Sequence, residues 1–102
     1  MKLNIGIFQY EMKDESPFEK INRLEKQLSK HSKLDLVLCP ELFISGYGSL
    51  EKIKEFSENR DGEYAKKISS LAKQFSTAII YGYPERSNGA LFNSAQIGRA
   101  HV

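Results

Sequence analysis

The sequence predicts an α/β fold, in which apolar strands alternate with amphipathic helices. The segment Lys2–Gln9 alternates like a strand, a helical pattern begins at Pro17, and Leu34–Cys39 is almost continuously apolar. Strand, helix and strand in this order favour two parallel strands joined by a right-handed crossover. A chain of 102 residues forms one domain at most, and the core that it can bury alone is modest.

The two predicted strands carry apolar side chains on both faces. In Lys2–Gln9 one face holds Leu3, Ile5 and Ile7. Phe8 lies on the other face, so we expect that face to be partly covered as well. Leu34–Cys39 is apolar after Asp35, a pattern typical of a strand that is covered on both faces.

A helix start lies between these strands. Ser16 can accept a hydrogen bond from a free backbone N–H, Pro17 suits the first helical position, and Glu19 completes a capping box. Helical spacing then predicts an apolar face and a solvent face. The apolar face comprises Phe18, Ile21, Leu24 and Leu28, and the solvent face comprises Lys20, Glu25, Lys26 and Lys30. The pattern fades over residues 29–32.

The second half of the chain predicts two more helices and a hairpin. A short helix spans Leu50–Phe56, with Ile53 and Phe56 facing inward. The clearest helical stripe follows a loop and comprises Tyr64, Ala65, Ile68, Leu71, Ala72 and Phe75. The last predicted elements are a strand at Thr77–Tyr83, a turn at Pro84–Gly89 and an antiparallel strand at Ala90–Gln96.

Composition excludes several classes of partner. Fifteen basic residues against 13 acidic ones give a formal net charge of +2, which is too even to suggest a nucleic-acid or membrane-surface partner. The single cysteine, Cys39, permits no internal disulfide and fits a reducing compartment. We find no signal peptide and no apolar run near the ~20 residues of a membrane span. We therefore expect a cytoplasmic protein without metal or cofactor.

The segment Leu34–Gly48 holds the candidate for chemistry. It runs from an apolar strand into Pro40-Glu41, and ligands of open α/β folds collect at the carboxyl ends of strands. Partial desolvation between apolar neighbours would raise the pKa of a carboxyl and suit Glu41 to general-base work. On position alone, a structural glutamate at a surface turn is the more ordinary interpretation.

The stretch L-V-L-C-P-E-L-F-I-S-G-Y, residues 36–47, resembles the first signature of the carbon–nitrogen hydrolases, the nitrilase superfamily. The segment A-x-x-F-x-T-A-I-I-Y-G-Y, residues 72–83, is similar to the family's second helix and third strand, and residues 92–95 to its next strand. The resemblance covers residues 2–96. It implies the N-terminal part of a four-layer α-β-β-α sandwich with a Glu–Lys–Cys site.

On that resemblance Glu41 is the general base, and the substrate is a small amide or nitrile. The family's lysine and cysteine follow later in the domain, so we expect this chain to be inactive by itself. The three lysines of the second long helix, Lys66, Lys67 and Lys73, are expected on its solvent face. Full-length members of the family commonly form homo-oligomers.

Two further residues of the signature need separate interpretations. Cys39 lies among apolar side chains and is assigned to the core, because such a cysteine behaves as a small hydrophobe. Tyr47 either lines the substrate pocket or packs in the loop with its hydroxyl hydrogen-bonded, and the sequence does not separate these alternatives.

The tail I-G-R-A-H-V, residues 97–102, resembles the translation of a sequencing-adapter oligonucleotide. We therefore interpret residues 1–96 as the N-terminal portion of a hydrolase domain and 97–102 as non-native, which removes Arg99 and His101 from consideration.

Two other functions stay open. The chain could be a complete α/β ligand-binding module, or an interaction domain whose sheet pairs with a partner. A sheet with one open apolar face would favour the hydrolase fragment.

Overall fold

The computed structural model describes residues 2–11, 13–31 and 33–98. Four strands form one sheet in the order β1-β2-β3-β4, comprising β1 (Ile5–Ile7), β2 (Leu36–Leu38), β3 (Ala78–Ser87) and β4 (Ala90–Gly98). The first three strands are parallel, and β4 is antiparallel to β3. The predicted α/β class and the parallel strand–helix–strand crossover are therefore confirmed.

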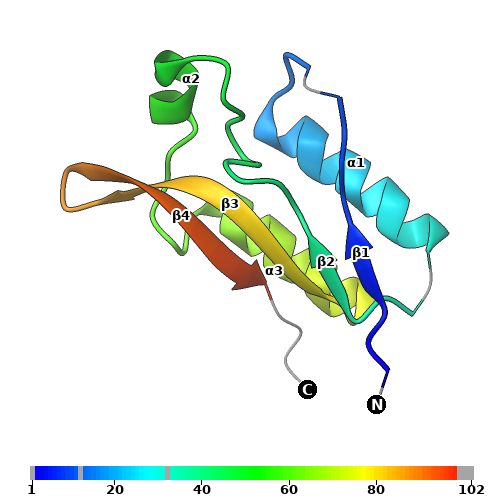
Figure 1. Ribbon diagram of the computed structural model, residues 1–102. Coiled ribbons are helices and arrows are strands. Elements are labelled where there is room, and N and C mark those ends of the chain that lie inside the picture. Colours follow the sequence, from blue (N-terminus) through cyan, green and yellow to red (C-terminus); the bar gives the residue numbers. More distant parts are fainter. Residues whose placement is uncertain (1, 12, 32, 99–102) are drawn as a thin grey trace.

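Two long helices cover one face of this sheet. Helices α1 (Pro17–Lys30) and α3 (Glu63–Phe75) pack against each other behind the strands, whereas the short α2 (Leu50–Glu55) stands apart from that layer (Figure 1). Their fully buried side chains form one core with the inward side chains of β2 and β3. This core includes Ile21, Leu24, Val37, Ile68, Leu71, Ile79 and Tyr81.

The opposite face of the sheet is open in the described part of the chain. Ile5, Ile7 and Leu38 are 56%, 67% and 43% exposed, and Ile97 on β4 is 51% exposed. The register places Ile7, Leu38 and Ile97 in one row across the sheet. The prediction that the first two strands are covered on both faces is therefore wrong for these residues.

Helix α1 begins as its sequence predicts. The Ser16 hydroxyl accepts from the Glu19 backbone N–H at 3.2 Å, and the Glu19 carboxylate accepts from the Ser16 N–H at 3.0 Å. This reciprocal pair, with Pro17 at the first position, satisfies two N–H groups that would otherwise lack partners.

The buried face of α1 is rotated from the predicted one. Phe18 is 43% exposed, whereas Lys20, expected in solvent, is 3% exposed. The residues that pack inward follow the spacing i, i+3, i+4, i+7 from Pro17 rather than from Phe18. A buried face that starts at Pro17 includes Lys20 by its spacing. Lys20 was predicted on the solvent face because a charged side chain is rarely buried.

The β3–β4 hairpin is longer than predicted. Pro84 to Ser87, expected in a turn, belong to β3, and β4 continues two residues past the predicted end to Gly98. Asn88 and Gly89 have φ of 51° and 79°, and a two-residue loop with two positive φ values matches the twist of the flanking strands. The turn therefore needs only these two residues. Residues 99–102, with Arg99 and His101, lie outside the described residues.

Removing the N-cap of α1 tests this account of the helix start. Ser16→Ala should lower the free energy of unfolding by about 1 kcal/mol, because the hydroxyl that accepts from Glu19 is lost. Urea unfolding of the protein followed by circular dichroism measures the change. Ser70→Ala, on the exposed face of α3, is the matched control and should change stability little. Equal effects of the two substitutions would contradict the capping box.

Candidate functional site

Glu41 lies on a turn that follows β2. Residues 41–45 form this turn, in which the Gly46 N–H donates to the Leu42 carbonyl at 2.7 Å. Leu42 and Gly46 adopt positive φ values of 50° and 73°, so the chain reverses tightly after the strand. Because β1 and β2 are parallel, Glu41 lies where their carboxyl ends meet, beside the middle of the longer strand β3.

The turn is seated on the backbone of β3. The Gly82 N–H donates to the Pro40 carbonyl, and the Ile44 N–H donates to the Gly82 carbonyl, both at 3.3 Å. A Cβ atom at Gly82 would lie 2.4 Å from the Leu42 nitrogen and 2.8 Å from the Glu41 Cα. Only glycine permits this approach of one backbone to another. Sequence reasoning passed over Gly82, whose only local signal is a glycine inside a strand.

Two apolar side chains anchor the turn in the core. Phe43 and Ile44 are both 0% exposed. The Phe43 ring meets the rings of Phe8 and Tyr10 edge-on, with centroids 5.9 and 5.8 Å apart. Such pairs add to the stability that burial alone supplies. The residues after Glu41 are therefore fixed, while Glu41 itself faces solvent.

The structure brings Tyr47 and Glu41 together. The Tyr47 hydroxyl donates to the Glu41 Oε1 at 2.6 Å, and this hydrogen bond raises the pKa of the tyrosine. The ring is 53% exposed, so it is not packed in the loop. The sequence left open whether Tyr47 packs in the loop with a hydrogen-bonded hydroxyl or lines the substrate pocket. The hydroxyl is hydrogen-bonded, but the ring is not packed. A role in substrate binding stays a prediction.

Glu41 is an exposed residue, so the expectation that its carboxylate is partly desolvated is wrong for the described chain. Its apolar neighbours Leu42, Phe43 and Ile44 turn into the core instead of surrounding it. The carboxylate at the end of a buried strand is thus presented at the surface.

Cys39 occupies the core, as the sequence predicts. Its side chain is 6% exposed and belongs to the main apolar cluster. Burial raises the pKa of the thiol to about 12, which keeps it protonated at neutral pH. A protonated, enclosed thiol is a poor nucleophile, so Cys39 is not a reactive group of this site.

The remaining polar residues singled out in the sequence lie away from Glu41. Lys66, Lys67 and Lys73 are exposed on α3, as expected. Within residues 2–11, 13–31 and 33–98, no group of three His, Cys, Asp or Glu side chains is placed to hold a metal ion. None of the described helices has the length and apolarity to cross a membrane.

Comparison with known proteins places this geometry in context. Residues 3–98 match the family model described as carbon-nitrogen hydrolase. The chain is 39% identical over 79 residues to a protein of Pseudomonas protegens named "Hydrolase in pqqF 5'region". That alignment covers 76% of this chain and 28% of the Pseudomonas protein.

Solved structures with the same fold are similar over nearly the whole chain. A CN-hydrolase superfamily protein from Xanthomonas campestris, XC1258, with an arsenic adduct in its active site, superposes with a TM-score of 0.77 at 26% identity. An N-terminal amidase superposes with a TM-score of 0.78 at 25% identity. Each match covers 93% of this chain but only 39% and 24% of those chains, respectively. The chain therefore spans well under half the length of these proteins.

The close approach at Gly82 is open to a direct test. Gly82→Ala should lower the free energy of unfolding by about 1–3 kcal/mol, because the new methyl group overlaps the backbone of Glu41 and Leu42. Urea unfolding measures the loss. Gly48→Ala is the matched control, since no atom lies within 4 Å of its added Cβ. A Gly82→Ala protein as stable as the control would refute the contact.

Cys39 should resist thiol reagents while the protein is folded. With a pKa of about 12, almost none of the thiol is ionised at pH 8, and its burial blocks access. Iodoacetamide labelling followed by peptide mass spectrometry should modify Cys39 only after urea is added. Rapid labelling in the native protein would contradict its place in the core.

Proposed function

The chain belongs to the carbon-nitrogen hydrolase family, and on this premise we propose that Glu41 is the general base of a hydrolase that cleaves non-peptide carbon–nitrogen bonds. The proposed substrate is a small amide, and the amidase type is preferred to the nitrilase type. The similarity to a solved N-terminal amidase supports this preference.

The observation that carries the proposal is the placement of Glu41. Its carboxylate is exposed at the carboxyl end of β2, while the turn beneath it is fixed by buried side chains and by the backbone of Gly82. A general base must reach the proton that it removes and must be held in place to do so. A rigid turn with an accessible carboxylate meets both requirements.

The proposed reaction needs a cysteine and a lysine from the part of the relatives' length that this chain does not span. Glu41 would take the thiol proton as the sulfur attacks the amide carbon, and would return that proton to the departing amine. A thioester would remain. Glu41 would then take a proton from water as its oxygen attacks the thioester, and would reprotonate the sulfur as the acid leaves. The lysine would stabilise the oxyanion of each tetrahedral intermediate.

Tyr47 is proposed to line the substrate pocket beside the base. Its hydroxyl holds one oxygen of the Glu41 carboxylate at 2.6 Å, which leaves the second oxygen available to a thiol or to water. The half-exposed ring lies beside that carboxylate and can contact an apolar part of a substrate.

The open face of the sheet favours a hydrolase fragment over a complete binding module. Exposed apolar side chains that include Ile5, Ile7 and Leu38 would contact water in a complete domain. We propose that further residues of the full-length protein cover this face as the second sheet of the α-β-β-α sandwich. The chain alone is then expected to be inactive, and the full-length protein a homo-oligomer.

The proposal is tested by removing the charge at Glu41 in the full-length protein. Glu41→Gln should lower the rate of ammonia release from short aliphatic amides that the unmodified protein hydrolyses by about 100- to 10,000-fold, because the amide side chain cannot accept a proton. Circular dichroism should show an unchanged fold, since the Glu41 side chain is exposed.

The control is Glu55→Gln, which removes the same charge from an exposed position on α2 and should leave the rate unchanged. A Glu41→Gln protein that retains near-normal turnover would exclude Glu41 as the base.

A further inference from the structure

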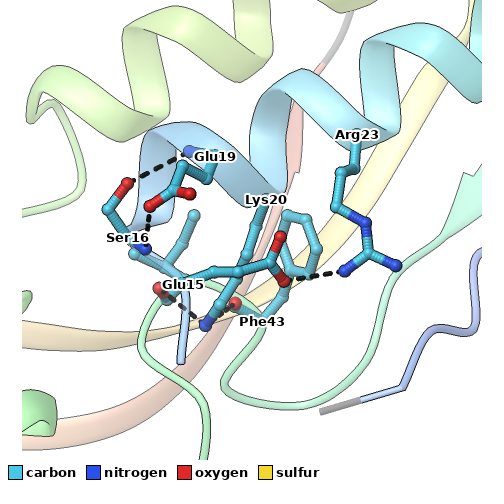
Figure 2. Close-up of polar contacts among 7 residues, drawn as sticks. Glu15, Ser16, Glu19, Lys20, Arg23 and Phe43 are labelled. Atoms are coloured by element: carbon cyan, nitrogen blue, oxygen red, sulfur yellow. Dashed lines mark hydrogen bonds and ion pairs between the residues drawn. The ribbon is translucent and has the colours of Figure 1, made fainter. Parts of the chain in front are cut away.

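Lys20 is a buried lysine that reaches the turn carrying Glu41. It lies on α1 and is 3% exposed. Its Nζ donates to the Phe43 carbonyl at 3.1 Å and to the Ile44 carbonyl at 3.2 Å, as Figure 2 shows for Phe43. The amine therefore joins a helix to residues 23 and 24 positions later in the chain.

These two carbonyls depend on Lys20. In the part of the chain that the structure describes, no backbone N–H donates to the carbonyl of Phe43 or of Ile44. Both residues are 0% exposed, so water does not readily replace a lost donor. A buried carbonyl without a donor is unfavourable. A donor that reaches the turn from α1 therefore stabilises its present shape.

Burial of a charged amine in this space is energetically unfavourable. Desolvation lowers the pKa of Lys20, opposed by the negative charge of Glu15, which itself pairs with Arg23 at 2.7 Å. An apolar side chain of similar volume would avoid the desolvation of a charge. A lysine differs from an apolar side chain because its N–H groups donate to two consecutive carbonyls and so fix the position of those carbonyls.

Lys20 couples the position of the Glu41 turn to that of helix α1. Its neighbours Ile21 and Leu24 are 0% and 1% exposed, and the capping box fixes the start of the same helix (Figure 2). The turn is therefore held from two sides, by the Gly82 backbone of β3 and by the Lys20 amine of α1. Phe43 follows Glu41 by only two residues, so a shift of these carbonyls moves the carboxylate.

We propose that Lys20 is a positioning residue, which sets the place of the Glu41 carboxylate by holding the carbonyls of Phe43 and Ile44. The inference rests on the proposed role of Glu41 as general base. Lys20 touches neither substrate nor reacting atoms in this scheme and acts through the turn alone.

The test uses Lys20→Met in the full-length protein, which keeps an unbranched side chain but removes the donor. We expect kcat for a short aliphatic amide to fall about 10–100-fold, because a displacement of the base near 1 Å has an effect of this size. KM should change by less than about threefold, since no substrate contact is lost. Lys26→Met, on the exposed side of α1, is the matched control and should leave both constants unchanged.

A double variant separates positioning from a merely structural role. If Lys20 acts through Glu41, Lys20→Met should not reduce the residual activity of a Glu41→Gln protein any further. A structural role would reduce that residual rate as well, in proportion to the loss of folded protein. Rates are therefore compared at equal total protein, and circular dichroism reports the folded fraction separately.

Two conservative variants extend the series. Lys20→Arg and Lys20→Gln retain a donor, so kcat should lie between those of the unmodified protein and Lys20→Met. A folded Lys20→Met protein with unchanged kcat would overturn the proposal, and so would failure of all three variants to fold. A fully active Glu41→Gln protein would instead reject Glu41 as the base. A strongly impaired Glu41→Gln protein beside a fully active Lys20→Met protein would reject only the role of Lys20.

Discussion

The contact on which the candidate site depends is the approach of the Glu41 turn to the backbone of Gly82. Regular pairing between β2 and β3 ends at Leu38 and Ile80, but hydrogen bonds from Gly82 and Ile44 extend the contact into the turn. A side chain at Gly82 would fill the space that the backbone of Glu41 and Leu42 occupies. The position of the carboxylate is therefore determined by the sheet, although the residue itself lies outside every strand.

The sheet is unequal in its two faces, and the register explains why. The row Val37, Ile79, Gly98 faces the helices, and Val37 and Ile79 are 3% and 0% exposed. The adjacent row contains Ile7, Leu38 and Ile97, which remain between 43% and 67% exposed. Apolar side chains on both faces are what a strand inside a layered sandwich requires. In a family whose solved members are much longer than this chain, such a face is where we propose that the second sheet packs.

Local patterns predicted most of the elements but not all of their limits. The capping box at Ser16 and Glu19 was predicted because it involves residues three positions apart. The hairpin turn was predicted too long, because Pro84 is a turn residue by composition yet pairs with Asn93 in the strand. Lys20 was placed in solvent because its charge outweighed its spacing from Leu24. In all three cases the sequence signal concerned near neighbours, and the two errors arose because Pro84 and Lys20 have partners elsewhere in the fold.

The sequence by itself determined the α/β order of elements, the core place of Cys39 and the location of Glu41 directly after a buried strand, because these follow from apolar periodicity and from residues adjacent in the chain. Only the tertiary structure decided how Glu41 is held and exposed. Gly82 and Lys20 reach its turn from elements distant in the chain, and Tyr47 meets it only because that turn reverses the backbone. Such contacts depend on how strands and helices pack, which no periodicity within one segment records.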